Sequence, residues 1–177
     1  MKYAIVYLLN DDFKKFHQRL VKDIAIKFDE NYLLDKKIPS HCTLKYTFNT
    51  KKIKEIEKMF EIFIKTQKPS TIKVKRLLSF NNRVICFKLD FSKESKIIYN
   101  NLHKELSKFE WLEWRDIDNI KEKLHATLVC ASSLKNFKKI NNYLSKLNLD
   151  YNINFDNITI LNKPRKYWKV YKVYKME

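Results

Sequence analysis

The sequence contains no glycine in its 177 residues. Glycine-rich loops that hold phosphates with backbone N–H groups, as in P-loop and Rossmann proteins, need backbone positions that glycine fills best. Those phosphate-binding classes are therefore excluded, and any phosphate must be held by side chains. Left-handed positions at turns and helix ends must be taken by asparagine or aspartate, the next most tolerant residues. The asparagines at expected element ends are Asn31, Asn81, Asn82, Asn136 and Asn148.

Cysteine and proline are also scarce, with three residues of each. Cys42, Cys86 and Cys130 stand far apart in apolar segments and lack the C-x-x-C spacing of zinc and redox sites. We expect them to be buried as small hydrophobic residues in a reducing compartment.

Long apolar runs are absent as well. The strongest run, residues 4–9, has the length of a strand and falls far short of the ~20 residues of a membrane span. The N-terminus lacks the basic and then apolar layout of a secretory signal. These features predict a cytoplasmic protein with no membrane partner.

Basic residues, in contrast, are in large excess. The chain has 37 lysine and arginine residues against 20 aspartate and glutamate residues, which gives a formal net charge of +17. This excess favours a polyanionic partner such as RNA, an oligonucleotide or a cyclic nucleotide. However, 32 of the 37 are lysine, and isoleucine and asparagine are also abundant, a composition typical of AT-rich genomes. The charge therefore supports a phosphate-bearing substrate without identifying one.

The length and the hydrophobic fraction of 45% predict one globular domain over residues 1–177. Hydrophobic periodicity and capping residues divide it into strands and helices. Strands are expected at 3–9, 41–48, 71–80, 83–89, 124–131, 153–161 and 166–174, and helices at 11–30, 50–67, 92–109 and 134–147. The pair Asn81–Asn82, between two of the strands, is typical of a tight hairpin.

The most informative pattern is His-x-Thr-apolar, which occurs twice, at 41–44 and at 125–128. In a strand, residues i and i+2 point to the same face about 7 Å apart, so each copy presents one imidazole and one hydroxyl on one surface. The copies lie 84 positions apart, close to half the chain, and each follows a strand and a helix. A strand–helix–strand unit written twice with a pseudo-twofold relation brings both copies to a central cleft. The plainer interpretation, two ordinary strands with satisfied histidines, explains this repeat less well.

Two histidines and two threonines that face one another suit cleavage or transfer at a phosphodiester. Histidine titrates near neutrality, so one imidazole acts as the base and the other as the acid. His41 and His125 take these roles in an order that the sequence leaves open, and Thr43 and Thr127 donate hydrogen bonds to non-bridging phosphate oxygens. No metal or cofactor is expected, because a zinc hydrolase needs carboxylate or cysteine ligands clustered beside the histidines.

The two motifs, their separation and the order of elements resemble the 2H phosphoesterase superfamily, which includes 2′-5′ RNA ligase-like proteins and cyclic phosphodiesterases. The resemblance covers nearly the whole chain in layout, and its residue-level content is confined to the two motifs. It implies an α+β fold of two pseudo-symmetric lobes, with antiparallel sheets lining a central cleft and helices outside. It also implies metal-independent action on 2′,3′-cyclic phosphates, 2′-5′ linkages, RNA 3′ ends or cyclic nucleotide messengers. Members often have a proline just before a motif histidine, where this chain has Ser40 and Leu124.

Eight further residues are candidates for substrate binding, each with an alternative structural role: Tyr7, Lys45, Trp111, Trp114, Arg115, Arg165, Tyr167 and Trp168. Lys45 is expected on the strand face of the first motif, where it steers phosphate or is simply solvated. Tyr7 is expected to line the cleft or to pack in the core. The candidates at 111–115 and at 165–168 are expected either to stack on a base of the substrate or to anchor irregular loops. In the first case, those at 111–115 form a lid. His17 and His103 lie on expected helices, and no catalytic role is predicted for them.

The sequence thus predicts a metal-independent phosphodiesterase or RNA-end-processing enzyme. Hydrolysis of a 2′,3′-cyclic end, cleavage or ligation at 2′-5′ linkages and destruction of a cyclic oligonucleotide remain open. Ligation reverses transesterification through the same two histidines, so the motifs do not separate these reactions. A non-catalytic RNA-binding module on the same fold is the alternative of a different class, and the intact histidines and threonines argue against it. The protein is expected to act as a monomer without an obligatory protein partner.

Overall fold

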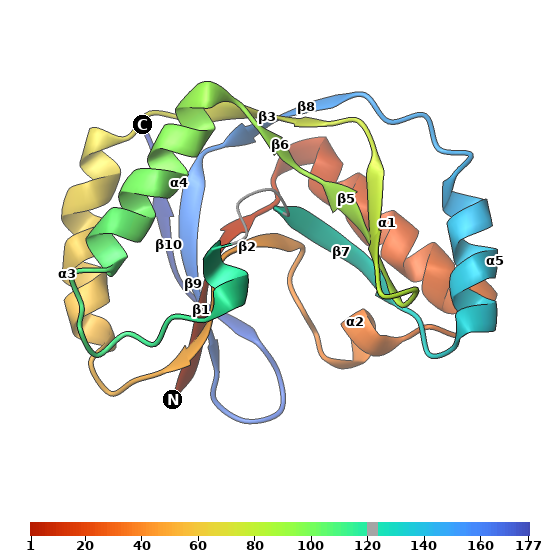
Figure 1. Cartoon of the computed structure of the whole chain (residues 1–177), viewed down its shortest axis with the longest axis horizontal. Coiled ribbons are helices and arrows are strands. Elements are labelled where there is room, and N and C mark those ends of the chain that lie inside the picture. The colour runs from red at the N-terminus through yellow and green to blue at the C-terminus, as the bar shows by residue number, and fades with distance from the viewer. Residues whose placement is uncertain (120–123) are drawn as a thin grey trace.

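The computed structural model describes residues 1–119 and 124–177 (Figure 1). The strands are β1 (Lys2–Leu8), β2 (His41–Asn49), β3 (Ser70–Val74), β4 (Leu77–Phe80), β5 (Val84–Lys88), β6 (Asp90–Phe91), β7 (His125–Cys130), β8 (Tyr151–Phe155), β9 (Asn157–Lys163) and β10 (Lys169–Lys175). The helices are α1 (Asp11–Phe28), α2 (Tyr32–Asp35), α3 (Ile53–Phe63), α4 (Lys93–Leu106) and α5 (Leu134–Leu144), with short 3-10 turns η1 (Ile64–Thr66) and η2 (Asp116–Asn119). Within these ranges, every helix is too short or too polar to cross a bilayer.

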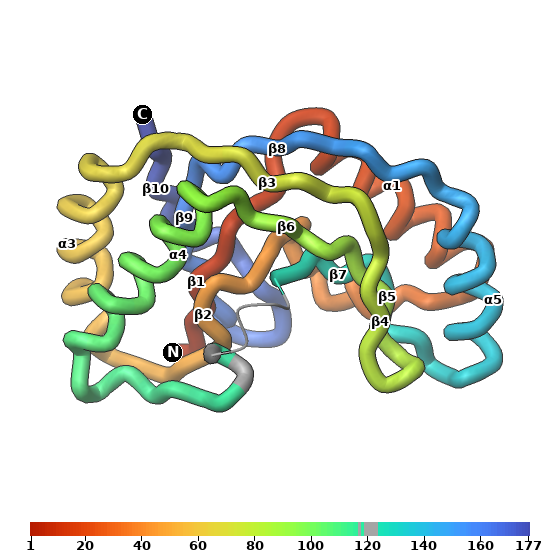
Figure 2. The backbone as a smooth tube through the Cα atoms, turned by 45° about the horizontal axis from the view of Figure 1, so that its top comes forward, coloured from red at the N-terminus to blue at the C-terminus, as the bar shows by residue number. Residues whose placement is uncertain are grey.

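The described strands form three antiparallel sheets, with the orders β10-β9-β1-β2, β4-β5-β7 and β6-β3-β8. β2 lies at one edge of the first sheet, and β7 lies at one edge of the second. The β6-β3-β8 sheet runs across the top of the molecule in Figures 1 and 2 and connects its two halves. This arrangement leaves the two motif strands facing each other between the halves.

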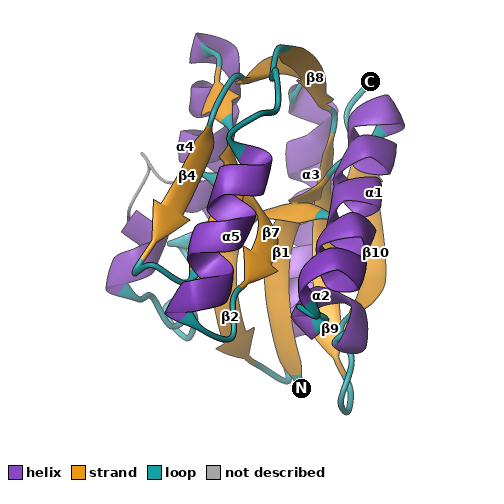
Figure 3. Cartoon of the chain, turned by 90° about the vertical axis from the view of Figure 1, so that its right-hand side faces the viewer, coloured by secondary structure: helices purple, strands orange, loops and turns teal. Residues whose placement is uncertain are grey.

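Helices cover the outside of both halves. α3 and α4 lie over the half built on β10-β9-β1-β2, and α1, α2 and α5 lie on the half that contains β4-β5-β7, the side that faces the viewer in Figure 3. α1 and α2 contact β7, and α5 contacts β5. The first helix of the chain therefore packs on the strand that carries the second motif.

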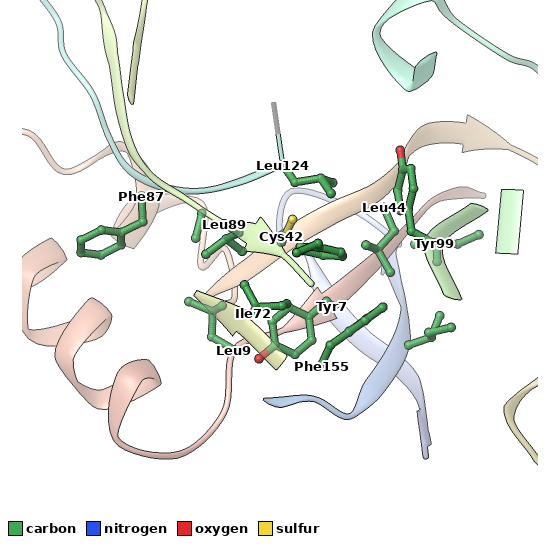
Figure 4. Packing of buried hydrophobic residues seen from close by; sticks show 14 of the residues in the cluster. Tyr7, Leu9, Cys42, Leu44, Ile72, Phe87, Leu89, Tyr99, Leu124 and Phe155 are labelled. Atoms are coloured by element: carbon green, nitrogen blue, oxygen red, sulfur yellow. The ribbon is translucent and has the colours of Figure 1, made fainter. Parts of the chain in front are cut away.

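Amphipathic helices and alternating strands bury one main hydrophobic cluster, which takes residues from both halves. The apolar stripe of α1 contributes Phe13, Leu20 and Ile24, which are all 3% exposed or less. Figure 4 shows part of this cluster, with Phe155 of β8 close to residues of the other sheets. The packing of both halves into one cluster holds the two motif strands at a defined separation.

In place of glycine, asparagine and aspartate take left-handed positions at one hairpin turn and at one helix end, as expected. Asn81 and Asn82 have φ angles of 52° and 49° and form the hairpin between β4 and β5. Asp29, with φ of 56°, ends α1 in the left-handed conformation. The expectation is wrong for the other candidates, because the described residues with positive φ do not include Asn31, Asn136 or Asn148. It is also wrong at Lys37, a lysine that takes a left-handed position with φ of 51°.

Two of the expected strands are each divided between two sheets. The segment expected as one strand at 71–80 is β3 followed by β4, and the segment expected at 153–161 is β8 followed by β9. In both segments the chain passes from the β6-β3-β8 sheet into one of the sheets that carry a motif. The sequence gives no sign of these breaks because neither contains glycine or proline.

Candidate active site

The two His-x-Thr motifs have the same alternation of burial in β2 and in β7. In each strand the histidine and threonine are half-buried, and the residue between them and the apolar residue after them are buried. The core takes Cys42 and Leu44 from one strand and Ala126 and Leu128 from the other, all at 2% exposure or less. Both motifs therefore leave their imidazole and hydroxyl groups on the open side of the strand.

β2 and β7 contact each other although they belong to different sheets. The backbone of His125 lies close enough to the Cys42 thiol to counteract the rise of its pKa, and the charge of His125 lowers the pKa of His41. The fold thus brings together four side chains from two segments that are 84 positions apart: His41, Thr43, His125 and Thr127.

Two cavities meet at these residues. One, of about 390 Å³, is lined by Thr43, His125 and Thr127, and another, of about 350 Å³, is lined by His41 and Thr127. Thr127 borders both cavities, so they adjoin at the motif residues. Volumes of a few hundred Å³ are usual for sites that bind small molecules.

The hydrogen bonding of His41 determines its tautomer. The Nδ1 atom lies 2.6 Å from the carbonyl oxygen of Pro39, and a carbonyl only accepts, so Nδ1–H donates and Nε2 keeps a lone pair. Burial lowers the pKa of His41 below its ordinary value, and the charge of His125 lowers it further against the effect of the Pro39 carbonyl. His41 is therefore neutral at pH 7, with Nε2 available to take a proton.

His125 has an aromatic neighbour, and the buried cysteines near the motifs are protonated. The ring of His125 lies 5.2 Å from the ring of Phe80, at the end of the β4–β5 hairpin. Burial raises the pKa of Cys42 and of Cys86 to about 12, so neither supplies a thiolate at neutral pH. The expectation that the three cysteines are buried is confirmed for these two, whereas Cys130 is only half-buried.

The prediction that Lys45 shares the face of the first motif is wrong. Ile5 and Val6 of β1 pair with Lys45 and Thr43, so Leu44 is the extra residue of a β-bulge. The bulge reverses the alternation, and Lys45 is fully buried. Its Nζ lies 2.9 Å from a carboxylate oxygen of Asp118, whose side chain is also buried. Lys45 therefore forms a buried ion pair and does not face the open side.

Asp118 connects the segment before β7 to β2. Its carboxylate accepts hydrogen bonds from the backbone N–H groups of Tyr46 and Arg115, at 2.8 and 2.9 Å, in addition to the bond from Lys45. Trp114 covers the ion pair, with Lys45 Nζ 5.0 Å from the centre of its ring. This network fixes the position of η2 beside the first motif strand.

Tyr7 packs in the core rather than along the cleft. Its side chain is fully buried, and its hydroxyl donates to the carbonyl oxygen of Asn154 at 2.8 Å. Figure 4 shows it beside Ile72 and Phe155, and the ring centres of Tyr7 and Phe155 are 5.3 Å apart. The alternative role that the sequence left open for this residue, packing in the core, is the one observed.

The aromatic residues at 111–114 make packing contacts. Trp111 donates its indole N–H to Glu55 at 2.8 Å, and the ring of Trp114 lies 5.2 Å from that of His103. The side chain of Arg115 is exposed. The expected loop continues through 120–123, which lie outside the described residues.

In the 165–168 segment, one candidate lies near a motif. Trp168 and the motif residues His41 and Thr43 line a common cavity of about 210 Å³. Tyr167 instead lies under Lys37, whose Nζ is 4.9 Å from the ring centre, and Arg165 is exposed. Trp168 is therefore the candidate from this segment that the structure brings to the motif residues.

Several residues at the 390 Å³ cavity were missed by the sequence interpretation: Tyr46, Phe80, Asn81, Tyr99 and Asp118. Phe80 and Asn81 belong to a hairpin that the sequence did predict, but nothing in the sequence places its end beside the second motif. Tyr46 reaches the cavity because the bulge changes the phase of β2, and bulges have no reliable sequence signal here without glycine.

Across the described residues, no group of three or more histidine, cysteine, aspartate or glutamate side chains is arranged to hold a metal ion.

Comparison with known proteins gave similarity in structure but not in sequence. No family model and no curated protein matches the chain. The solved structure of TT0787 from Thermus thermophilus has a TM-score of 0.66 at 11% identity, and the match covers 99% of this chain and 98% of that one. E. coli LigT in complex with 3′-AMP has a TM-score of 0.55 at 12% identity, and the match covers 99% and 97% of the two chains. These solved structures are members of the 2H phosphoesterase superfamily, and the chain has the α+β fold that they share, as its two motifs predicted.

Proposed function

We propose that the protein is a metal-independent phosphodiesterase that acts on an RNA end or a nucleotide phosphodiester by two-histidine acid–base catalysis. The candidate bonds are a 2′,3′-cyclic phosphate, a 2′-5′ linkage and a linkage of a cyclic oligonucleotide. The observation that carries the proposal is the convergence of the two His-x-Thr motifs on the contacting strands β2 and β7. If the repeat had only a structural role, the polar side chains of both copies would not be expected to line one cavity.

The surroundings of the two histidines support an assignment of their roles. His41 is neutral and has its Nε2 lone pair available, so it is the base that takes the proton of the attacking water or hydroxyl. The attacking oxygen bonds to phosphorus, and the bond from phosphorus to the leaving ribose oxygen breaks. His125 donates a proton to that leaving oxygen. Thr43 and Thr127 donate hydrogen bonds to the non-bridging oxygens as negative charge builds on them.

Three further features support a nucleotide substrate. E. coli LigT has been solved in complex with 3′-AMP and with ATP, and it has the fold of this chain. The net charge of +17 favours a phosphate-bearing ligand. The motif residues border two adjoining cavities, which leave room for the groups attached to the phosphorus. We also propose that the protein acts in the cytoplasm, in keeping with three free cysteines.

The proposal is tested by incubating the purified protein with a panel of phosphodiesters in the presence of EDTA. The panel contains 2′,3′-cyclic mononucleotides, a 2′-5′ oligonucleotide, its 3′-5′ counterpart and cyclic dinucleotides. Turnover of at least one compound, lost in both His41→Ala and His125→Ala, is the expected result. Absence of turnover across the panel would favour the RNA-binding module, and activity that EDTA abolishes would contradict the metal-independent mechanism.

A further inference from the structure

The two histidines outside the motifs both contact the motif strands. His17, on α1, is 4% exposed, and its Nε2 lies 2.8 Å from the carbonyl oxygen of Thr127 in β7. Its Nδ1 lies 3.0 Å from the hydroxyl of Ser40, the residue before His41. One imidazole ring therefore bridges the segments that carry the two motifs, and these segments come from different sheets.

The partners of His17 determine where its proton lies. A carbonyl oxygen only accepts, so Nε2 carries the hydrogen and donates it to Thr127. In a neutral ring Nδ1 is then an acceptor, and the Ser40 hydroxyl donates to it. Burial lowers the pKa of His17 to about 4, so the ring stays neutral and keeps this arrangement at neutral pH.

His103 has a corresponding contact on the other motif strand. It lies on α4, and its Nε2 donates to the carbonyl oxygen of Leu44 in β2 at 2.8 Å. Its ring also lies against Tyr99 and Trp114, with ring centres 4.2 and 5.2 Å away. Each motif strand thus receives one hydrogen bond from a histidine on a helix, and the chain has only four histidines.

We propose that His17 and His103 are positioning residues. They hold the two motif strands, and hence His41 and His125, in the relative positions that the reaction requires. The proposal rests on the proposed function. His17 also lines the 350 Å³ cavity. The proposed role is nevertheless exerted through the backbone, because each ring hydrogen-bonds to a backbone carbonyl of a motif strand. Histidine suits the bridging role at position 17, since its ring is rigid, donates at one edge and accepts at the other.

A positioning role predicts a loss of rate rather than of binding. A displacement of about 1 Å between reacting groups can cost about 10²-fold in rate. We therefore expect His17→Phe and His103→Phe each to lower kcat by about 10-fold to 100-fold, with KM changed by less than about 3-fold. The probes are 2′,3′-cyclic AMP and 2′-5′-linked diadenosine. Glutamine, whose side-chain N–H donates at a similar distance, is expected to restore most of the lost kcat at either position.

Matched controls separate this role from a loss of stability. Leu20→Ala on α1 and Ile98→Ala on α4 each remove a buried apolar side chain that lines none of the cavities described above. Each is expected to lower the melting temperature and leave kcat unchanged, measured well below the melting point. Values of kcat within about 2-fold of the parent in folded His17→Phe and His103→Phe would overturn the proposal. If the phenylalanine variants do not fold, Ser40→Ala replaces them as the test, because it removes only the contact at Nδ1 of His17. The proposal then requires Ser40→Ala to lower kcat.

An NMR measurement tests the proposal without activity. With ¹⁵N-labelled histidine the protein gives four imidazole spin systems, and His17 is expected as the Nε2–H tautomer. His17→Phe, which removes both hydrogen bonds, is expected to shift the ring resonances of His41 and His125. The opposite tautomer at His17, or unchanged motif resonances in the variant, would overturn the positioning role. If the parent turns over no compound of the phosphodiester panel, the proposed function fails, and the NMR result still decides whether His17 holds the motifs.

Discussion

The motif histidines have the same sequence context but different neighbours in the structure. His41 donates Nδ1–H to the carbonyl of Pro39, whereas His125 lies against the ring of Phe80. A backbone acceptor at Nδ1 leaves Nε2 as the basic atom. The same hydrogen bond fixes both the orientation of the ring and its tautomer. The proposed assignment of base and acid therefore rests on the groups around each ring and not on the motif.

Removal of either motif histidine should abolish most of the activity. General acid–base catalysis contributes about 10²-fold to 10⁴-fold, so His41→Ala and His125→Ala should each lower kcat by about 10² or more. Steady-state kinetics on the best substrate of the panel measures this. The exposed Thr71 on β3 offers a control, since Thr71→Val should leave kcat unchanged. Full activity in both alanine variants would contradict the mechanism.

The pH dependence of kcat/KM follows from the pKa of His41. A base must be deprotonated to act, so activity should fall as pH decreases through the pKa of His41. Burial and His125 lower that pKa, so the acidic limb should lie below the ordinary histidine value of about 6.5. A pH–rate profile measures it, and an acidic limb centred above pH 7 would contradict the assignment of His41 as the base.

The stability of the protein should also depend on pH through His17. Its pKa is about 4 in the folded state and about 6.5 in the unfolded chain, so the unfolded state binds more protons between these values. The free energy of unfolding should therefore fall as pH decreases from about 6.5 to 4, by up to about 3 kcal/mol from this group. Urea unfolding at pH 7.5, 6 and 5 should show a weaker pH dependence in His17→Gln, and equal slopes in both proteins would contradict the shift.

At the scale of elements, the β-bulge in β2 changes which side chains reach the site. It turns Lys45 into the interior, where Asp118 of η2 pairs with it and also accepts from the backbone N–H of Tyr46. The ion pair therefore anchors the segment that precedes β7. A lysine in a strand pattern gives no indication of this, because the partner lies 73 positions away.

Breaking this buried pair should cost more than breaking an exposed one. Asp118→Ala leaves Lys45 buried without a counter-charge, and such changes typically cost about 3–5 kcal/mol of unfolding free energy. The partly exposed pair of Lys88 and Asp90 is the control, and Asp90→Ala should cost about 1 kcal/mol or less. Urea unfolding of both variants measures the difference, and equal losses would contradict the anchoring role of Asp118.

At the scale of the whole molecule, basic side chains line one cavity that adjoins the cavity at the second motif. A cavity of about 560 Å³ shares Phe80 and Tyr99 with the cavity at the second motif, and its lining includes the exposed Arg76 and Lys96. Exposed cations beside an anionic strand act mainly through the release of its counterions, which makes the interaction depend on salt. These basic side chains would therefore contribute more to the binding of a substrate that extends beyond the reacting nucleotide than to the binding of a mononucleotide.

The salt dependence of KM should accordingly increase with the length of the substrate. Between about 50 and 200 mM NaCl, KM for an oligonucleotide of several nucleotides should rise more steeply than KM for 2′,3′-cyclic AMP. Arg76→Ser combined with Lys96→Ser should flatten the oligonucleotide curve and leave the curve for the small substrate unchanged. Replacement of Lys138 and Lys139 on α5 provides a control with the same change of charge. Identical slopes for both substrates would contradict a role for this charge.

Local patterns determined much of this protein. The periodicities predicted the main helices and strands, the Asn81–Asn82 turn was confirmed, and the two motifs identified the fold. These properties depend on residues close together in the chain, where spacing and backbone preference act directly.

Only the tertiary structure decided how the elements are shared between the sheets and what surrounds each motif residue. The crossings at β3–β4 and β8–β9, the burial of Lys45 and the bridge made by His17 all depend on partners far away in the chain. His17 looked unimportant in the sequence because its two partners, Ser40 and the Thr127 carbonyl, are 23 and 110 positions away. Contacts of this kind form only when the core brings distant strands together, and so no local pattern records them.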